Sequence, residues 1–369
     1  MPATFATDYA TSFAKASDVK ESLAGQRKLR WIKIAGRPSP DAFSVYILIY
    51  SGIMEKMKAI VYDKKSFPDK LVSRDVEKPV PNDNEVLIKV HAVSLNAADY
   101  RSMKMGMIPE RKIFGADIAG RVESVGKNIS LFKPGDEVLG DLSSYGFGGL
   151  AEYVTAPEEA VILKPEKISF EEAAALPMAA LTALQALRNK GNIQKGQKVL
   201  IAGSSGGVGT FAVQLARYFG AVVAGVCSSG NVSQTLSLGA DSVIDYTKED
   251  FTKGDKRYDI ILAVNGNYPL LACKRKLTTN GIYVMVGGSL SQIFKSIVFG
   301  RMLSLGSRKI KFLAAKANKA DLEFLAKLME NGIIKPVIDR RYPLERAAEA
   351  MNYLKQGHAA GKVAISGDT

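Results

Sequence analysis

The chain has 369 residues, of which 47% are hydrophobic and 24% are charged. These values are typical of a globular protein with a sizeable core, and they exclude a disordered chain. The 33 glycines show no triplet period, which excludes collagen. No run of about 18 apolar residues occurs, so the sequence predicts no transmembrane helix. The length favours about two domains.

The formal net charge is +13, from 50 Lys and Arg against 37 Asp and Glu. A basic balance suits a nucleic acid, an acidic membrane or a phosphorylated ligand, and does not choose among them. Cys227 and Cys273 are the only cysteines, which excludes a disulfide framework and favours the cytoplasm. The two histidines, His91 and His358, lie too far from these cysteines in sequence to show zinc-site spacing.

Residues 1–53 differ in character from the remainder, with a basic run around the single tryptophan, Trp31. Three interpretations stay open: a misassigned start before Met54 or Met57, an organelle transit segment, or an interaction arm. The four acidic residues weaken the transit interpretation, because transit peptides avoid acids. We expect this extension to be disordered or absent from the native protein. The transit interpretation would replace the cytoplasm with an organelle.

Residues 57–165 alternate between apolar and polar side chains and turn often. This pattern predicts a compact β region, barrel-like in form. Gly115, Gly120, Gly126 and Gly135 punctuate it at turns and close approaches. The expected strands are 58–62, 85–95, 118–126, 137–140 and 151–156.

A different pattern begins at Ser169, which has capping-box spacing to Glu172 and predicts the start of a helix. From residue 197 apolar strands alternate with helical stretches, as in a doubly wound Rossmann sheet. Two amphipathic helices, near 319–331 and 344–356, precede a last strand at 362–366. The strands expected in the Rossmann sheet are 198–203, 222–227, 242–244, 259–264, 282–286 and 309–313.

The glycine-rich stretch 201–217 follows a buried strand and opens a helix, which is typical of a dinucleotide-binding loop. Gly203 permits the tight turn, and Gly206 and Gly207 let backbone N–H groups approach a pyrophosphate. Gly209 permits close helix–strand packing. The helix N-terminus adds about half a positive charge at the same place.

The end of the second strand of the Rossmann sheet, 222–227, indicates which dinucleotide is bound. It reads Cys227-Ser228-Ser229-Gly230-Asn231 and lacks the carboxylate that holds an NAD ribose. Its hydroxyls and amide can bond either a 2′-phosphate or a 2′-hydroxyl, and no Arg or Lys is present. We therefore predict NADPH as the cofactor, with NADH as an alternative.

Residues 57–369 resemble the medium-chain dehydrogenase/reductase superfamily, and within it the zinc-independent quinone oxidoreductase (zeta-crystallin-like) branch. The motifs that carry the resemblance are Gly196-Gln197, Leu200, Ser204-Ser205-Gly206-Gly207-Val208-Gly209, Gln214 and Arg217, together with Gly115-Ala116-Asp117-Ile118-Ala119-Gly120 and Lys133-Pro134-Gly135-Asp136-Glu137-Val138 in a chaperonin-10-like region. Close relatives often carry Arg where Gly230 stands, so the resemblance does not imply strong NADPH selectivity.

The resemblance implies an α/β fold, a doubly wound Rossmann sheet plus a chaperonin-10-like β-barrel catalytic domain. The catalytic domain would comprise 54–177 completed by 313–369, and the dinucleotide-binding domain 178–312. The substrate cleft would lie between them, with Asn96 near the nicotinamide. The implied cofactor contacts are Thr182, Ser205, Gly206, Gly207, Val208, Ser228, Asn231, Tyr246, Val264 and Gly287.

Zinc alcohol dehydrogenases of this superfamily carry an early Cys, a Gly-His-Glu step and a later Cys. Here residues 94–99 contain no cysteine, the step reads Gly115-Ala116-Asp117, and residues 136–155 contain no cysteine. Zinc needs three or four N, S or O ligands in tetrahedral reach. The sequence therefore predicts no metal.

Without a metal, hydride delivery to an electron-poor acceptor is the easiest chemistry, so we expect a quinone or an α,β-unsaturated carbonyl (enone) as substrate. The resulting oxyanion needs hydrogen-bond donors. Candidate catalytic residues are Tyr100, Arg101 and Tyr145, with Asn96. Asp99 either orients Arg101, relays a proton, or forms a simple surface ion pair.

Other functions stay open beside this one. An enoyl-thioester reductase or a zinc-less alcohol dehydrogenase-like reductase would use the same fold. A nucleotide-dependent RNA- or membrane-binding protein is the alternative of another class, although no aromatic and basic RNA platform is evident, so no nucleic acid is expected. Residues 291–309 are apolar with interspersed cations, which suits peripheral membrane contact or, more often, a sheet edge or dimer interface. We expect a homodimer.

Overall fold

The computed structural model describes residues 55–65, 70–264, 268–287, 304 and 306–367. The chain divides into two compact units, Met1–Met54 and Glu55–Thr369, and the described residues all belong to the second. The predicted extension 1–53 and most of the apolar segment 291–309 therefore lie outside the described residues.

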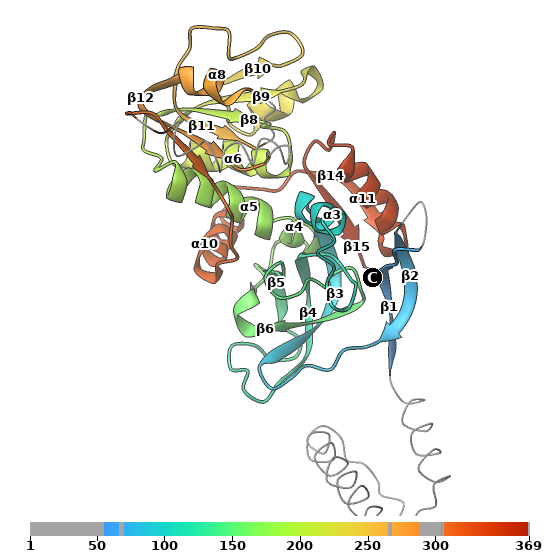
Figure 1. Ribbon diagram of the computed structural model, residues 1–369. Helices are drawn as coiled ribbons and strands as arrows, with labels where there is room; N and C mark the ends of the chain where they lie inside the picture. Colours follow the sequence, from blue (N-terminus) through green and yellow to red (C-terminus); the bar gives the residue numbers. More distant parts are fainter. Residues whose placement is uncertain (1–54, 66–69, 265–267, 288–303, 305, 368–369) are drawn as a thin grey trace, which may run out of the picture. The chain divides into compact units, whose positions relative to one another are not determined.

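A six-stranded parallel sheet forms in the order β10-β9-β8-β11-β12-β13, seen in the upper part of Figure 1. Numbered within the sheet this is 3-2-1-4-5-6, the order of a doubly wound dinucleotide-binding fold. All six predicted strands are confirmed. They are β8 (Lys198–Ala202), β9 (Val222–Cys227), β10 (Ser242–Asp245), β11 (Tyr258–Ala263), β12 (Leu277–Met285) and β13 (Lys309–Phe312).

Successive side chains of a strand point to opposite faces of the sheet. In this sheet both sets of side chains are buried. Val199 and Ile201 of β8 pack with helix α6 (Gly207–Tyr218), α5 (Pro177–Leu184) and α10 (Lys319–Glu330). Leu200 packs on the other face with a second cluster. The shorter helices α7 (Val232–Ser237) and α8 (Leu270–Arg275) complete the unit.

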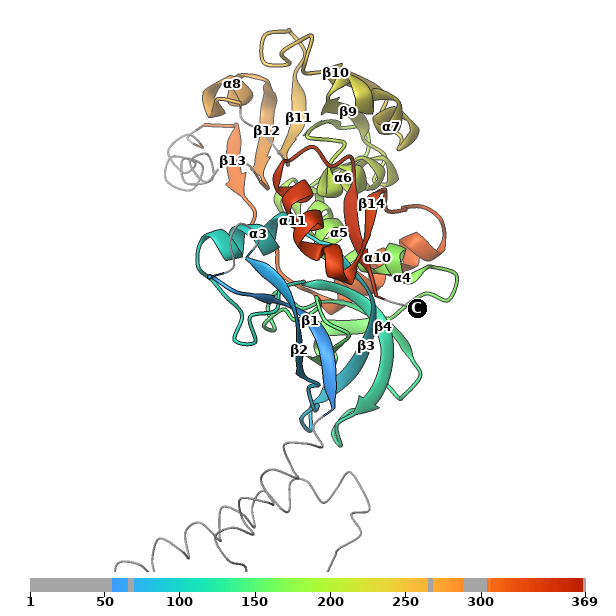
Figure 2. The same ribbon diagram turned by 90° about the vertical axis from the view of Figure 1, so that its right-hand side faces the viewer.

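A second, mixed sheet has seven strands, six of them in the order β14-β15-β3-β4-β5-β7, with β6 paired to β3. The last strand of the chain pairs antiparallel with β3, so the C-terminal segment returns to the first part of the fold (Figure 1 and Figure 2). The strands are β3 (Glu85–Leu95), β4 (Asp117–Val125), β5 (Glu137–Asp141), β6 (Tyr153–Pro157), β7 (Val161–Leu163), β14 (Ile338–Pro343) and β15 (Lys362–Ser366), beside a hairpin of β1 (Lys56–Tyr62) and β2 (Leu71–Glu77).

Several of these elements were not predicted. Strands β2, β7 and β14 are short or rich in charge, so their alternation is weak. A helix, α3 (Ala97–Lys104), interrupts the region expected to be all β. It begins where Asn96 leaves β3 and Ala-Ala-Asp follows, with the Asp99 carboxylate accepting the Asn96 backbone N–H at 2.7 Å.

The predicted helix start at Ser169 is confirmed. In α4 (Phe170–Ala174) the Ser169 hydroxyl oxygen accepts the Glu172 N–H at 3.2 Å, and the Glu172 carboxylate accepts the Ser169 N–H at 3.1 Å. The two late helices are also confirmed, as α10 and as α11 (Ala347–Lys355) preceded by the 3-10 turn η4 (Leu344–Arg346). The remaining short helices are η1 (Glu158–Ala160), η2 (Gln185–Lys190, a π-helix) and η3 (Ser229–Asn231).

Two buried glutamines fasten the connections between the sheets. Gln185 donates to the Lys316 carbonyl at 2.8 Å and accepts the Lys316 N–H at 3.1 Å. Gln214 of α6 likewise donates to the Lys335 carbonyl at 2.9 Å and accepts the Lys335 N–H at 2.9 Å. Both satisfy backbone groups that a buried connection would otherwise leave unpaired. Within the described part of the chain, no helix has the length and apolar character needed to cross a membrane.

Candidate functional site

The phosphate loop has the geometry that its glycines predict. Gly203 follows β8 with φ +91°, a conformation that side chains disfavour. A Cβ on Gly209 would lie 2.0 Å from the Gly203 carbonyl oxygen, so this position tolerates only glycine without a shift of backbone. Gly206 is the N-cap of α6, and a Cβ there would meet nothing closer than 3.9 Å. The loop is thus closed toward the sheet and open at the helix N-terminus.

A cavity of about 140 Å³ opens over this loop, between the ends of β8 and β11 where the strand order reverses. Ligands of doubly wound sheets bind at this switch point. The structure brings together six of the predicted cofactor residues in its lining: Ser205, Gly206, Ser228, Asn231, Tyr246 and Val264. Gly287 is adjacent, since a Cβ on it would lie 2.5 Å from the Val264 carbonyl oxygen. The remaining three, Gly207, Val208 and Thr182, lie at the start of α6 and within α5 and do not line this cavity.

Sequence reasoning missed one wall of the cavity. Gly357, His358 and Ala359 line it from the loop that precedes β15, more than a hundred residues after the phosphate loop. The Ala360 carbonyl accepts a hydrogen bond from Gln234 Nε2 at 3.2 Å, which holds this loop against α7. No local signal identified it, because only the return of the chain end to β3 places it there.

The polar side chains after β9, where the resemblance implies the adenosine end of the cofactor, already form hydrogen bonds within the protein. Asn231 donates to Ser205 Oγ at 3.2 Å and to Ser228 Oγ at 3.1 Å. Ser229, expected to bond the ribose or its phosphate, instead donates to Asp245 Oδ2 at 2.5 Å. Asp245 therefore competes with a ribose or phosphate for the Ser229 hydroxyl proton, and the predicted role of Ser229 stays a prediction.

A carboxylate does lie beside the end of the second strand of the parallel sheet, on the neighbouring strand. It belongs to Asp245, which the sequence analysis did not single out. It ends β10 and lies in register with Cys227, the end of β9. Hydrogen bonds from Ser229 and Thr247 hold the pKa of Asp245 well below its ordinary value. Neighbouring parallel strands end at the same edge of a sheet, so inspection of the next strand end would have identified this residue.

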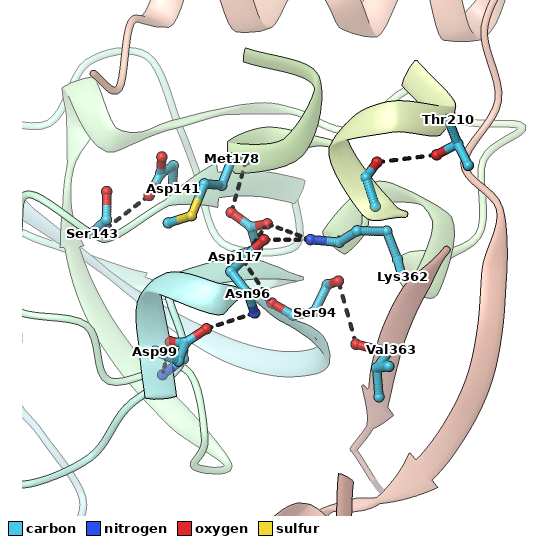
Figure 3. Close-up of polar contacts among 12 residues, drawn as sticks. Ser94, Asn96, Asp99, Asp117, Asp141, Ser143, Met178, Thr210, Lys362 and Val363 are labelled. Atoms are coloured by element: carbon cyan, nitrogen blue, oxygen red, sulfur yellow. Dashed lines mark hydrogen bonds and ion pairs between the residues drawn. The ribbon is translucent and has the colours of Figure 1, made fainter. Parts of the chain in front are cut away.

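A second polar centre surrounds Asp117, the first residue of β4, whose side chain is 0% exposed. Its Oδ1 accepts the Met178 backbone N–H at 3.0 Å. Its Oδ2 accepts the Asn96 Nδ2 proton at 2.8 Å and lies 3.3 Å from the Lys362 ammonium nitrogen. Figure 3 shows these partners converging on the carboxylate from α5, the end of β3 and β15.

The side-chain amide of Asn96 has a fixed orientation. Its Oδ1 accepts a proton from Lys362 Nζ at 2.6 Å, and its Nδ2 also donates to the Ser94 carbonyl at 3.2 Å. An ammonium only donates and a carboxylate only accepts, so Lys362 and Asp117 together determine which end of the amide is oxygen. Asn96 remains 8% exposed.

Asp99 is fully buried rather than part of a surface ion pair. Its carboxylate accepts the backbone N–H groups of Asn96, at 2.7 Å, and Gly115, at 3.1 Å. Burial raises the pKa of Asp99 to about 6. Burial likewise raises the pKa of Asp117 to about 7, against the opposing effect of the Lys362 charge. Burial therefore disfavours ionisation of both carboxyl groups, while their hydrogen bonds and the Lys362 charge favour it.

The other predicted catalytic residues lie on two segments, and none of them lines the cavity. Tyr100 and Arg101 belong to α3, with the guanidinium carbon 5.9 Å from the Tyr100 ring centroid. Tyr145 lies on the separate loop after β5 and is 39% exposed. Burial, with the charges of Glu159 and Asp141, raises the pKa of Tyr145, so its phenol keeps its proton at neutral pH. It can therefore act as a hydrogen-bond donor.

A zinc site does not fit these residues. Across the described ranges, no three His, Cys, Asp or Glu side chains are grouped so that they could hold a metal ion. The buried carboxylate of Asp117 faces an ammonium group, Lys362, in place of a metal-binding partner. Cys227 and Cys273 are buried thiols, and burial raises the pKa of Cys273 to about 12, so it is an inert thiol.

Comparisons with known proteins find relatives of this chain among oxidoreductases. The family model for the alcohol dehydrogenase GroES-like domain matches residues 82–166, and that for the zinc-binding dehydrogenase matches residues 238–365. A chloroplast envelope quinone oxidoreductase homolog of Arabidopsis thaliana is 35% identical over 79% of this chain and 92% of its own length. An NADPH-dependent alkenal/one oxidoreductase of the same plant is 31% identical over 91% of this chain and 86% of its own. The structure of the quinone oxidoreductase from Coxiella burnetii is 32% identical, covers 85% of this chain and 99% of its own, and has a TM-score of 0.76.

Gly209, which faces the sheet, and Gly206, at the open helix N-terminus, can be compared in a matched pair of variants. Gly209→Ala should lower the free energy of unfolding by about 1–3 kcal/mol, because its methyl group has no room. Gly206→Ala should lose less stability, since its methyl points into open space. It should nevertheless weaken NADPH binding by obstructing the pyrophosphate. Urea unfolding without cofactor and equilibrium NADPH titration measure the two effects. Equal unfolding free energies, or unchanged NADPH affinity in Gly206→Ala, would contradict this assignment of the loop.

Proposed function

The chain belongs to the medium-chain dehydrogenase/reductase superfamily, in its quinone oxidoreductase branch, and we propose that it transfers a hydride from NADPH to a quinone or an α,β-unsaturated carbonyl. One observation carries the proposal: six of the ten predicted dinucleotide contacts line one cavity at the switch point of the parallel sheet. The names of the two plant relatives and of the Coxiella structure give the acceptor classes.

The bound nicotinamide supplies the hydride, and the chain supplies position and electrostatics. The N-terminus of α6 directs backbone N–H groups at the pyrophosphate through Gly206 and Gly207. Val264 and Gly287 border the nicotinamide ring. Thr182 lies one helical turn after Met178, whose backbone N–H binds Asp117, and in this proposal Thr182 contacts the nicotinamide together with Asn96. These two polar groups flank the ring and fix its orientation.

The acceptor becomes an oxyanion when it takes the hydride, and donors must stabilise that charge. Tyr145 retains its phenolic proton and Arg101 carries a permanent charge, so both serve as donors in this proposal. Tyr100 positions Arg101 on α3. Burial raises the pKa of Asp99 to about 6, and in this proposal Asp99 relays a proton. It lies behind Asn96, whose backbone N–H it binds, and does not contact the acceptor.

The cofactor preference in this proposal is NADPH over NADH, and the preference is modest. Ser228 and Tyr246 line the adenosine end, and His358 joins them from the loop before β15. Asp245 lies close behind and carries a negative charge that opposes a 2′-phosphate. No zinc takes part in the reaction as proposed, since the carboxylate at the step 115–117 is partnered by a lysine.

The broader setting of the enzyme stays a prediction. We propose two functional parts, 54–177 with 313–369 and 178–312, and a homodimer. The cytoplasm and an organelle remain the two proposed locations, and an Arabidopsis relative is named as a chloroplast envelope protein.

Turnover of a panel of quinones, enals and enones with NADPH and with NADH tests the proposed function. Quinones and enones should be reduced, while saturated ketones and alcohols should not react, because they lack a conjugated acceptor. A chelator should leave the rate unchanged, and elemental analysis should find no stoichiometric zinc. Reduction of none of the conjugated acceptors, or a rate that depends on zinc, would overturn the proposal.

Gly230→Arg tests the assignment of the adenosine end. A Cβ on Gly230 has no atom within 4 Å, so the arginine side chain can be accommodated. A guanidinium there should strengthen NADPH binding by about 1 kcal/mol or more through a charge-assisted hydrogen bond. NADH binding should change little and serves as the control. Titration of both cofactors against both proteins measures the effect, and an unchanged ratio of the two affinities would refute the assignment.

A further inference from the structure

Lys362 connects the phosphate loop to the polar centre around Asp117. Neither the sequence motifs nor the relatives' names give it a role. It is the first residue of β15, and only 2% of it is exposed. A Cβ on Gly207 would lie 2.9 Å from Lys362 Cδ, so the aliphatic stem lies directly against the start of α6. Its ammonium group reaches Asn96 and Asp117 on the other side. One side chain therefore spans the distance from the phosphate loop to Asn96.

This placement is chemically demanding. A buried lysine is costly unless its charge is paired and its protons are accepted. Here Asn96 Oδ1 accepts at 2.6 Å, and Asp117 Oδ2 provides the opposite charge at 3.3 Å. The same Asp117 oxygen accepts the Asn96 amide proton at 2.8 Å. The three side chains thus form a closed triangle in which every contact restrains the other two (Figure 3).

We propose that Lys362 is a positioning residue for hydride transfer, which fixes the Asn96 amide at a set spacing from the phosphate loop. The stem determines the spacing because it packs on Gly207, and the ammonium determines the orientation because it only donates. Asn96 Oδ1 keeps one lone pair free for a hydroxyl of the cofactor. This inference rests on the proposed function, because the spacing matters only if a nicotinamide lies beside Asn96.

An alternative role for Lys362 is to balance the charge of Asp117 and nothing more. The two roles predict different results when the charges of Lys362 and Asp117 are removed together. Lys362→Met keeps the stem but removes the ammonium, so Asp117 keeps its hydrogen bonds from Met178 and Asn96 but loses the opposite charge. The double variant Lys362→Met with Asp117→Asn leaves no unpaired charge, yet both charged groups that orient the Asn96 amide are gone. Only the Ser94 carbonyl, 3.2 Å from Asn96 Nδ2, then remains to orient it.

The chain offers a matched control in Lys164, a second buried lysine. It pairs with Glu137 at 3.0 Å and donates to the carbonyls of Pro165 and Ile168, at 2.9 and 2.6 Å. Lys164→Met should therefore lower the melting temperature as Lys362→Met does. Its kcat should be unchanged, because none of its partners belongs to the site.

The experiment measures kcat, the Kd for NADPH, the fluorescence of bound NADPH and the melting temperature of the full chain and these variants. Lys362→Met should lower kcat by about 10- to 100-fold, as expected for a misplacement of up to about 1 Å, with a change in Kd of less than about threefold. The double variant should regain melting temperature but not kcat. Bound-NADPH fluorescence should change in both Lys362 variants and not in Lys164→Met.

Two results would overturn the inference: a wild-type kcat in Lys362→Met, or recovery of kcat together with melting temperature in the double variant. Failure of the proposed function is a separate outcome. If the wild type binds NADPH but reduces no conjugated acceptor, bound-NADPH fluorescence still decides whether Lys362 positions the nicotinamide. Unchanged fluorescence in the Lys362 variants would then refute the positioning role.

Discussion

The buried charge of Asp117 is the constraint on which the rest of the site depends. A carboxylate removed from water must be paired and hydrogen-bonded, and removing one partner of such a pair typically costs about 3–5 kcal/mol. Asp117 is satisfied by Met178 of α5, Asn96 at the end of β3 and Lys362 of β15. Three segments far apart in sequence are thereby held at one point. The need to partner the Asp117 charge therefore also brings together the segments that carry Asn96 and Lys362.

The same point joins the mixed sheet to the parallel sheet. Lys362 begins the strand that pairs with β3, while its stem and the loop before it lie against α6 and α7. The loop of residues 357–359 closes the cavity that the parallel sheet opens between β8 and β11. A cofactor on the phosphate loop would therefore contact both parts of the fold. Hydride transfer in this site would therefore use polar groups that are already oriented before the cofactor binds.

Local patterns predicted those features that depend on local physics. Glycine spacing gave the phosphate loop, alternation and apolar runs gave the parallel strands, and Ser169 with Glu172 gave a helix start. The missing features are long-range. Lys362 and the loop at His358 reach the site only through strand pairing, which a single sequence does not encode in any short motif. Asp245, the partner of Ser229, ends the strand next to β9 and required a comparison of two strand ends.

Direct transfer of hydride from the cofactor to a conjugated acceptor is the central claim of this account. NADPH deuterated at both C4 positions, supplied to the full chain with an enone in ordinary water, measures it by mass spectrometry of the product. The account predicts one deuterium on the carbon β to the carbonyl, because that hydrogen comes from the nicotinamide and does not exchange with water. A reduced product without deuterium would contradict it.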